Sequence, residues 1–473
     1  MTSTFKLHLM RAGTPVGGLP SFDKIEAVEQ PVFTRPSFVG TINDIKVIYA
    51  KRNTASEYRA VDVGVGWEGL LVVMSDGTAW GWDSSFRVGV DPVVFQGYDI
   101  TKDLVRVEPT LDLSDFVKCD VFGDQFHMLD RWGKHYSWGY QCYGTSGTLH
   151  HSSYCACWHG SPCSGDPEAI VAAIYPCSIY AWDGQEGYGG VLIDEVNQWS
   201  HVATGGWSAQ GIKTDGSLWG WGYNAYGMIG IGNPYGAPGD PDETCIRPLP
   251  EACDTVKTNW VKTDTGQVAA AAVDDEGYIW TWGSNWYGGV LGQGVDPESR
   301  FLDDLGTPTK ITSVGGKFID VESSEYSMMA LTSDGELWFW GDGYKGNCAH
   351  VPGTLGCDDY GAYWCEHWSP VKISGSHNFI AFSHGWYHTI AIDSNNNVWV
   401  AGMDDGGCLG LGLDDEEDHY TWEQIPNFQA SYVDAGYSVS IAIGLDGTVW
   451  AWGWLGDFIN TPRQLKFGTY WAE

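Results

Sequence analysis

The stretch Asp446-Gly447-Thr448-Val449-Trp450-Ala451-Trp452-Gly453 decides the fold of this chain. An Asp-Gly pair between apolar, β-prone runs predicts a tight hairpin, because the turn needs positive φ angles that glycine adopts freely. The runs on either side are therefore predicted to be antiparallel strands. Because side chains alternate along a strand, Trp450 and Trp452 should share one face and leave Ala451 on the other, where a neighbouring sheet can approach closely.

The same turn and tryptophan strand recur along most of the chain. Clear copies begin at Asp76, Asp215, Glu276 and Asp334, and weaker copies are 132–138 and 395–399. With the stretch at Asp446 there are seven copies, at intervals of 51 to 61 residues over most of the chain. Regular repetition predicts one closed ring of β-repeats rather than several separate domains.

Composition excludes several classes of function. Sixty acidic residues against 25 basic ones leave a formal charge of −35, which repels phosphate backbones and anionic membrane surfaces. We therefore expect no nucleic-acid partner. The chain has no apolar run long enough for a membrane span, and residues 1–13 lack the continuous apolar core of a secretory signal.

Residues 202–232 show the plan of one repeat: a strand ending at a glycine pair, a second apolar strand, the Asp-Gly turn, the tryptophan strand and a glycine-rich exit. This plan resembles the repeat of the regulator of chromosome condensation family, which reads roughly Ala-Gly, His-Thr, Asp-Gly-x-Val-Trp-x-Trp-Gly and Asn-x-x-Gly-Gln-Leu-Gly. Other matching stretches are His388-Thr389, 283–294 and 406–412. The resemblance covers residues 61 to about 467. It implies an all-β fold, a seven-bladed β-propeller of four-stranded blades.

The resemblance also gives the expected domain boundaries. Residues 1–60 should form an N-terminal arm with strand character in two alternating runs, 4–9 and 45–49. Residues 61–473 should form the propeller.

Two features concern the closure and size of the ring. In the family the chain ends share a blade, so the strand near 461–467 is predicted to complete the first blade, whose other strands lie around 61–82. This closure would remove the exposed edge of a linear array. Residues 171–183 align with 441–453 but lack the Asp-Gly turn, so eight blades are the alternative.

Insertions recur at one point of the repeat, after the tryptophan strand. In a cyclic array equivalent loops lie on one side, where binding surfaces usually reside, so we expect 139–170, 233–255, 343–368 and 413–424 on one face or rim. Most of the twelve cysteines lie in or near these insertions and are disulfide candidates, with Cys245 and Cys253 as a local pair. The candidates are Cys142, Cys155, Cys157, Cys163, Cys245, Cys253, Cys348, Cys357 and Cys365.

Metal binding is a weaker interpretation of the same insertions. Cys155, Cys157, His159 and Cys163 offer soft ligands for zinc, but their spacing matches no common zinc finger. Free thiols in a reducing compartment are a third option. The acidic run 414–418 does not match a calcium loop and is interpreted as a solvated surface. We therefore favour no metal and expect no cofactor.

Tryptophans divide into two groups. Twelve of the 26 occupy repeat positions and are predicted to be blade core. Others fall in the exit loops, where large rigid rings suit contacts with proteins or sugars; the alternative is that they only pack the loops down. The binding candidates are Trp158, Trp286, Tyr287, Trp364, Trp368, Trp422 and Trp454.

No Ser-His-Asp elbow, phosphate loop or His-Glu-x-x-His motif is present, and His388 is interpreted as a structural residue of the repeat. We therefore expect a non-enzymatic interaction or structural protein that acts within a larger assembly. The predicted setting is a virion, as a phage tail, attachment or decoration component, or the extracellular space, with a cytoplasmic location as the alternative. Its partners would be proteins, or a host-surface glycan or protein, bound through the loop insertions.

The resemblance implies two further functions. The family's best-known activity is guanine-nucleotide exchange on a small GTPase with chromatin docking, so a regulatory propeller that acts as an exchange factor or signalling scaffold is the alternative. The basic segments of that role are not recognisable here. Plant ultraviolet-B photoreceptors of the family carry Gly-Trp-Arg-His-Thr in successive blades; 385–389 is similar, but 66–70 and 206–210 depart and the arginine is absent. An enzyme site in the central channel has no residue-level support.

Overall fold

The computed structural model describes residues 8–11, 45–48, 59–67, 69–83, 103–106, 115–123, 125–139, 191–192, 199–224, 226–232, 246–253, 255–285, 289–294, 304–344, 346–349, 364–412 and 417–467. Within these ranges the regular structure is β-strand apart from the short 3₁₀ helix η6 (Asp405–Gly407). No helix among them is long and apolar enough to cross a membrane.

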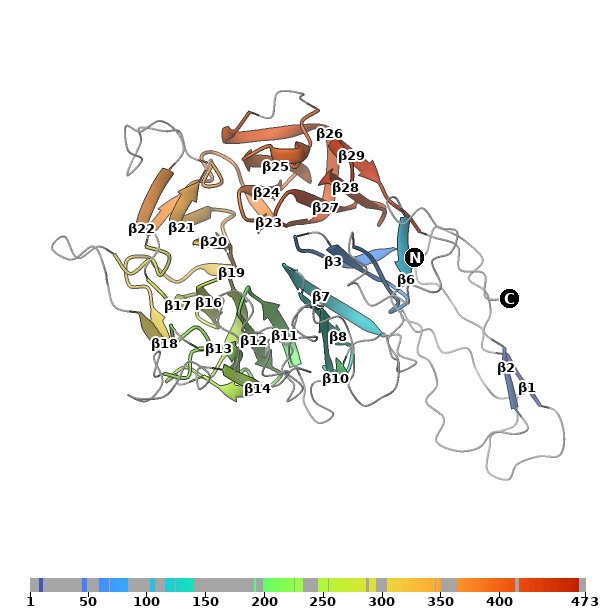
Figure 1. Ribbon diagram of the computed structural model, residues 1–473, viewed down its shortest axis with the longest axis horizontal. Helices are drawn as coiled ribbons and strands as arrows, with labels where there is room; N and C mark the ends of the chain where they lie inside the picture. The colour runs from blue at the N-terminus through green and yellow to red at the C-terminus, as the bar shows by residue number, and fades with distance from the viewer. Residues whose placement is uncertain are drawn as a thin grey trace, which may run out of the picture.

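Four-stranded antiparallel sheets, the blades, follow one another along the chain, and the described residues form seven of them (Figure 1). Each blade is built in the order of its sequence, from an inner strand to an outer one. The blades are β3 (Ala60–Val65), β4 (Gly69–Met74), β5 (Ala79–Asp83), β6 (Asp103–Arg106); β7 (Phe116–Phe122), β8 (Gln125–Asp130), β9 (His135–Gly139), β10 (Val191–Leu192); β11 (Trp199–Thr204), β12 (Ser208–Lys213), β13 (Leu218–Tyr223), β14 (Ile246–Ala252); β15 (Trp260–Thr265), β16 (Ala269–Asp274), β17 (Ile279–Gly283), β18 (Leu305–Lys310); β19 (Phe318–Ser323), β20 (Ser327–Thr332), β21 (Leu337–Tyr344), β22 (Trp364–Lys372); β23 (Phe379–His384), β24 (His388–Asp393), β25 (Asn397–Gly402) with the first part of β26 (His419–Ala435); and the second part of β26 with β27 (Val439–Gly444), β28 (Val449–Trp454) and β29 (Phe458–Gln464).

The inner strands close a ring. β3 contacts β7, and the contacts continue through β11, β15, β19, β23 and the second part of β26, which contacts β3 again. This arrangement confirms the all-β propeller fold. The segment 171–183, which we weighed as an eighth copy, lies outside the described residues.

The segment 461–467, predicted to complete the first blade, is divided between two blades. Trp450 faces Gln464 and Ala451 faces Arg463, so β29 is the outer strand of the last blade and does not belong to the first. Among the described residues after β29, the two of β30 (Lys466–Phe467) pair in parallel with β6 of the first blade. The reason is proximity: a short turn brings the chain straight back to the open edge of β28, whose backbone groups need partners.

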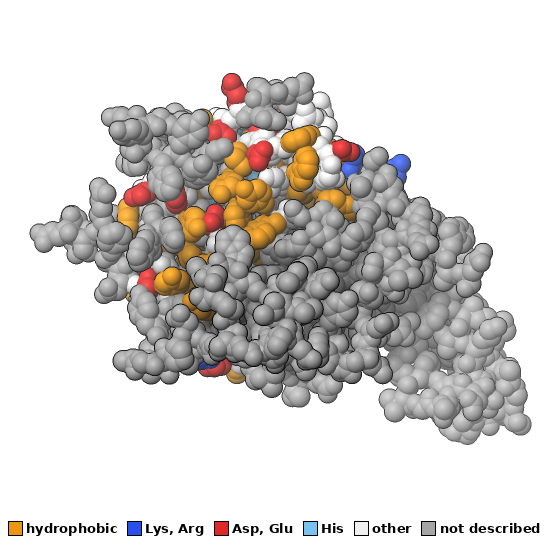
Figure 2. Space-filling view, viewed as in Figure 1, with side chains coloured by type: hydrophobic (Ala, Val, Ile, Leu, Met, Phe, Trp, Pro, Cys, Tyr) orange, Lys and Arg blue, Asp and Glu red, His pale blue; other side chains and the backbone are white. Residues whose placement is uncertain are grey.

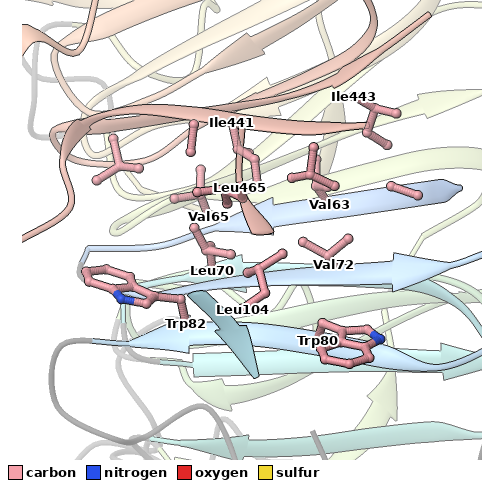
Figure 3. Close-up of a cluster of buried hydrophobic side chains, with 14 of the residues drawn as sticks. Val63, Val65, Leu70, Val72, Trp80, Trp82, Leu104, Ile441, Ile443 and Leu465 are labelled. Carbon is pink, nitrogen blue, oxygen red and sulfur yellow. The ribbon is translucent and has the colours of Figure 1, made fainter. Parts of the chain in front are cut away.

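Side-chain packing also closes the ring. Val63 and Val65 of the first blade pack in one buried cluster with Ile441 and Ile443 of the last, and Leu465 joins it from the C-terminal segment (Figure 3). These side chains are at most 8% exposed, so the seam between the first and last blades is as dry as a blade interior.

The tryptophan strands join neighbouring blades. In the fourth and the last blade the second tryptophan of the motif is fully buried and donates its indole N–H to a carbonyl in the preceding blade: Trp282 Nε1 to Met228 O at 2.9 Å, and Trp452 Nε1 to Cys408 O at 2.8 Å. The first tryptophan is half-buried; Trp450 donates to Thr448, whose hydroxyl donates to Asp446. Where the structure describes them, these side chains belong to the blades as predicted.

The N-terminal segment contains two short strands. β1 (His8–Arg11) and β2 (Ile45–Ile48) pair antiparallel in a separate two-stranded sheet. They overlap the two alternating runs predicted to have strand character.

Candidate binding face at the mouth of the central cavity

Strand direction gives the ring two different faces. The turns between the first and second strands of each blade, such as the one at 385–387, lie on one side together with the exits after the third strands. We call this side the loop face, because the predicted insertions begin there. The Asp-Gly turns, such as 446–447, and the links between blades lie on the opposite side, which we call the turn face.

A cavity of about 310 Å³ occupies the centre of the ring and is lined by inner-strand residues. Five carboxylates on these strands each accept a backbone N–H from the next blade around the ring. The pairs are Asp62 with Cys119 N at 2.8 Å, Asp120 with Thr204 N at 2.6 Å, Asp264 with Ser323 N at 2.5 Å, Glu322 with His384 N at 2.8 Å, and Asp434 with Val65 N at 2.7 Å. The acidic lining therefore holds the blades together.

Burial dominates the acid–base behaviour of these groups. Desolvation raises the pKa of Asp62 and of Asp434 to about 7, that of Asp120 to about 6 and that of Glu322 to about 8. Burial alone would lower the pKa of Lys262, but its carboxylate neighbours outweigh burial and raise it; its Nζ lies 3.0 Å from Asp320.

The described residues of the cavity contain no cluster of three or more His, Cys, Asp or Glu side chains placed to hold a metal ion. The carboxylates are already committed to backbone donors of the neighbouring blade. We therefore assign the lining a structural role.

Aromatic rings line the cavity at its loop-face end, and we call this group the aromatic cap; its members are Trp67, Phe122, Trp386 and Tyr437. Trp386 lies at the centre of this aromatic cap: its ring centroid is 5.2 Å from that of Trp67, 5.1 Å from that of Tyr437 and 6.3 Å from that of Phe122. Trp67, Trp386 and Tyr437 each follow the glycine that ends an inner strand. These glycines leave no room for a Cβ; one on Gly436 would collide with the carbonyl oxygen of Gly66, so the turns and their rings are held close together.

A groove of about 520 Å³ lies against the cap on the loop face. We call it the loop-face groove; its lining is Trp67, Trp386, Asp405, Gly406, Tyr437, Ser438, Trp454 and Phe458. Trp67 is 41% exposed, Trp454 42% and Phe458 65%, and the last two rings meet edge to face at 4.7 Å. Gly406 carries the chain past these rings with a φ of 70°, a left-handed conformation that favours glycine.

Comparisons with known proteins agree with this architecture. The family model described as the regulator of chromosome condensation (RCC1) repeat matches residues 334–392. Yeast RCC1 (Prp20), solved in complex with Kap60, superposes with a TM-score of 0.60 over 91% of each chain at 16% identity. The chain is an RCC1-like β-propeller. Curated relatives include the ultraviolet-B receptor UVR8 of Arabidopsis thaliana, 28% identical over 53% of this chain and 54% of the receptor, and the regulator of chromosome condensation of Xenopus laevis, 31% identical over 32% of this chain and 33% of that protein.

This RCC1-like propeller spans less than two thirds of the length of these curated relatives. It covers 59% of the mitochondrial RUG3 protein of Arabidopsis thaliana and 5% of the human E3 ubiquitin-protein ligase HERC2.

The structure separates the predicted loop aromatics. Trp454 lies in the loop-face groove, as a binding residue would. Trp422 packs instead: its indole donates to Ile373 O at 3.0 Å and its ring lies 4.9 Å from that of Phe379. Trp368 is half-buried and lies against Gly289, and Trp364 is placed in β22. Trp158, Trp286 and Tyr287 lie outside the described residues.

Two predicted disulfide candidates are free thiols in the structure. Cys253 Sγ donates to Ile229 O at 3.2 Å inside the blade, so the pair predicted with Cys245 is not formed, and Cys348 is buried. Burial raises the pKa of the Cys253 thiol, which makes it a poor nucleophile. Of Cys365 only the backbone in β22 is described. The remaining candidates, Cys142, Cys155, Cys157, Cys163, Cys245 and Cys357, lie outside the described residues, as does His159 of the zinc interpretation.

His388 joins two blades of the propeller. It is fully buried, its Nε2 lies 2.8 Å from the Ser440 hydroxyl of the next blade, and burial lowers its pKa to about 4. These contacts fit the structural role predicted for it.

Sequence reasoning missed most of the loop-face groove. Trp67, Trp386 and Tyr437 carried a signal that we did not use, since an aromatic residue follows the same glycine in three repeats that the ring brings together. Phe458 and Asp405 carried none, because they belong to connections of irregular length.

Proposed function

We propose that this propeller is a non-enzymatic binding protein that holds a protein partner on its loop face. The observation that carries the proposal is the loop-face groove, in which Trp67, Trp454 and Phe458 expose large rings side by side. Clustered exposed aromatics are costly in water and are typical of the centres of protein interfaces.

The scaffold beneath the groove supports this role. Trp386 and Tyr437 are bound on one side into the aromatic cap and face the groove on the other. A partner would therefore meet rings that are already ordered, which reduces the entropy lost on binding.

Regulation of a small GTPase, as an exchange factor or a signalling scaffold, is the second candidate. The comparisons favour it, because Prp20p of Saccharomyces cerevisiae binds Gsp1p and histones, and its structure is similar to this chain with a TM-score of 0.59 at 14% identity. Release of fluorescent GDP from a small GTPase, accelerated by catalytic amounts of this propeller, would support exchange. An unchanged rate would leave only the binding function.

The comparisons give no support to a virion or extracellular role. The relatives and structural neighbours named above are plant, frog, yeast and human proteins. The argument from disulfides for an oxidising location is also weaker, because Cys253 and Cys348 are free thiols. A cytoplasmic location, the alternative weighed from the sequence, is the one we propose.

Affinity capture with matched surface variants tests the proposal. The loop-face variant is Trp454→Ala with Phe458→Ala, and the turn-face control is Lys317→Ala with Asp334→Ala, an exposed ion pair with N···O of 2.6 Å. Proteins captured from the source cells should be lost with the loop-face variant and retained with the control. The same captured proteins with all three baits would contradict the proposal, provided that both variants melt as the parent does.

A further inference from the structure

We infer that the loop-face groove takes a lysine or arginine side chain from a basic segment of the partner. This inference rests on the proposed function and adds the chemistry of the contact. The groove combines aromatic walls with one exposed carboxylate, Asp405. A cation bound there would face ring π-electrons and a carboxylate at once.

The orientation of the rings suits a cation. Trp67 stands at 84° to Trp386, and Trp454 stands at 67° to Phe458. Rings at steep angles do not form the flat platform that a sugar stacks on, but they do surround a compact or elongated side chain. Asp405 and Gly406 complete the lining beside Trp454.

The propeller already uses this chemistry elsewhere. On the turn face Lys213 Nζ lies 3.4 Å from the ring centroid of Trp219, and Lys310 Nζ lies 3.0 Å from that of Tyr278. The two rings lie in or directly before a tryptophan strand, and both lysines come from the neighbouring strand of the same blade. In the loop-face groove no described lysine or arginine fills the equivalent role.

Basic side chains are distributed unequally between the two faces. Among the residues whose side chains the structure describes, every lysine and arginine but one lies on the turn face, on an outer or inner strand that reaches this face, or in the cavity. These residues are Arg59, Lys118, Arg131, Lys134, Lys213, Lys257, Lys262, Lys310, Lys317, Lys372, Arg463 and Lys466. The exception, Arg247, lies near the loop face and is paired with Glu251 at 3.5 Å.

Turn-face cations are largely neutralised by their own face. Lys257 lies 2.8 Å from Asp275, Lys317 lies 2.6 Å from Asp334, and Lys372 lies 2.8 Å from Glu336. These three lysines are therefore neutralised by carboxylates of their own face.

The loop face has a surplus of negative charge. Burial, together with repulsion from Glu366 and Glu325 on the same face, raises the pKa of Asp342 to about 7. Figure 2 shows one face of the molecule, on which hydrophobic and acidic side chains predominate among the coloured atoms and basic ones lie at the margins. With a formal charge of −35 overall, the loop face is complementary to a basic segment.

A neutral ligand would use only part of this site. A glycan would contact the rings and donate hydroxyl groups to Asp405, but it would gain no charge attraction from this carboxylate. Glycan binding is therefore the competing outcome of the test.

The probe is a fluorescein-labelled dodecapeptide that alternates arginine and glycine, with versions that carry lysine or glutamine in place of arginine and with maltohexaose as a neutral ligand. Binding is measured by fluorescence anisotropy, or by calorimetry for the sugar. The variants are Asp405→Asn and Phe458→Ala, and the matched control is Asp334→Asn, which removes the same charge from the turn face.

We expect the arginine and lysine peptides to bind and the glutamine peptide and the sugar not to bind. Asp405→Asn should weaken binding of the arginine peptide about three- to tenfold and Phe458→Ala about tenfold, whereas Asp334→Asn should change it less than about twofold. Equal weakening by Asp405→Asn and Asp334→Asn would reduce the effect to overall charge and would overturn the inference, as would binding of maltohexaose or the glutamine peptide with equal affinity.

The test separates this inference from the function beneath it. If no basic peptide binds but capture of the partner still requires Trp454 and Phe458, the loop face is a binding face and the cationic contact is wrong. If capture does not require these residues, the proposed function itself fails.

Discussion

Asp434 offers a test of the acidic lining that holds the blades together. One carboxylate oxygen accepts Val65 N of the first blade at 2.7 Å, and the other accepts the Ser383 hydroxyl of the preceding blade at 2.7 Å. Asp434→Asn keeps an oxygen for Val65 and directs an N–H at Ser383, whose oxygen has a second lone pair beside the one used by Ala435 N. The substitution therefore preserves the joints and removes the titration.

The magnitude follows from the pKa. Burial raises the pKa of Asp434 from its ordinary value of 3.8 to about 7. Between these values the folded protein holds a proton that the unfolded chain releases, so the free energy of unfolding falls as pH rises. One pKa unit corresponds to about 1.4 kcal/mol. Ionisation of Asp434 should therefore lower the free energy of unfolding by at most about 3 kcal/mol between pH 5 and 8. Water in the cavity reduces this value.

Urea unfolding of both proteins, followed by tryptophan fluorescence at pH 5, 6, 7 and 8, measures the effect. Asp434→Asn should gain stability relative to the parent by about 1 to 3 kcal/mol across this range, because the other buried acids titrate in both proteins and cancel in the difference. Asp334→Asn on the turn face controls for loss of one charge. If the difference in free energy of unfolding between Asp434→Asn and the parent is the same at every pH, the reasoning about the acidic lining is refuted.

Three other substitutions test the joints between blades. Trp452→Phe removes a buried hydrogen bond of 2.8 Å to Cys408 O and part of a fully buried ring, and should lower the free energy of unfolding by about 2 to 4 kcal/mol in urea; a loss below about 0.5 kcal/mol would contradict the role given to this indole. Gly266→Ala places a Cβ against the Ser324 carbonyl oxygen of the next blade and should cost at least about 3 kcal/mol or prevent folding, whereas Gly315→Ala, with nothing within 4 Å, should change the melting temperature little; equal effects would be inconsistent with close approach of the blades. Lys262→Met leaves Asp264 and Glu322 without their cation and should destabilise the ring by about 3 kcal/mol or more at pH 8 and by less at pH 5, where burial keeps these two acids protonated; a larger loss at pH 5 would argue against the assignment.

Local features of the fold were predictable because their causes are local. The Asp446 carboxylate accepts the backbone N–H of Thr448 at 3.0 Å and its hydroxyl at 2.6 Å, and Gly447 takes a φ of 83°. Every group that fixes this turn lies within three positions of sequence. The repeat of the turn then predicts a ring, since identical blades bury their faces only against one another.

Ring closure was not predictable in the same way. The final strand could pair with the edge of β28 or with the first blade, and both edges offer the same backbone groups. Because the turn after Trp454 is short, the strand pairs with the nearer edge, that of β28. Leu465 contributes only its side chain to the seam. This competition is decided by distance in space, which the pattern of residues does not contain.

The candidate binding site was predictable only in part. Trp454 was singled out because it follows a tryptophan strand, and it lies in the loop-face groove. Trp67, Asp405 and Phe458 come from different blades and different kinds of connection, so only the closed ring brings them together. Trp422 has the same sequence character as Trp454, yet its indole donates to the carbonyl of Ile373, just after the outer strand of the preceding blade, at 3.0 Å and is thereby packed down.

Photo-crosslinking in the source cells tests the central claim most directly. Phe458→p-benzoylphenylalanine places a photoreactive ring in the loop-face groove at a position that is 65% exposed, and Lys317→p-benzoylphenylalanine places the same group on the turn face. Mass spectrometry of the products identifies both the partner and the crosslinked segment. We predict crosslinks from position 458 to a segment rich in lysine or arginine and none to that partner from position 317. Crosslinks to the partner from position 317 alone would contradict the claim that the loop face is the binding face.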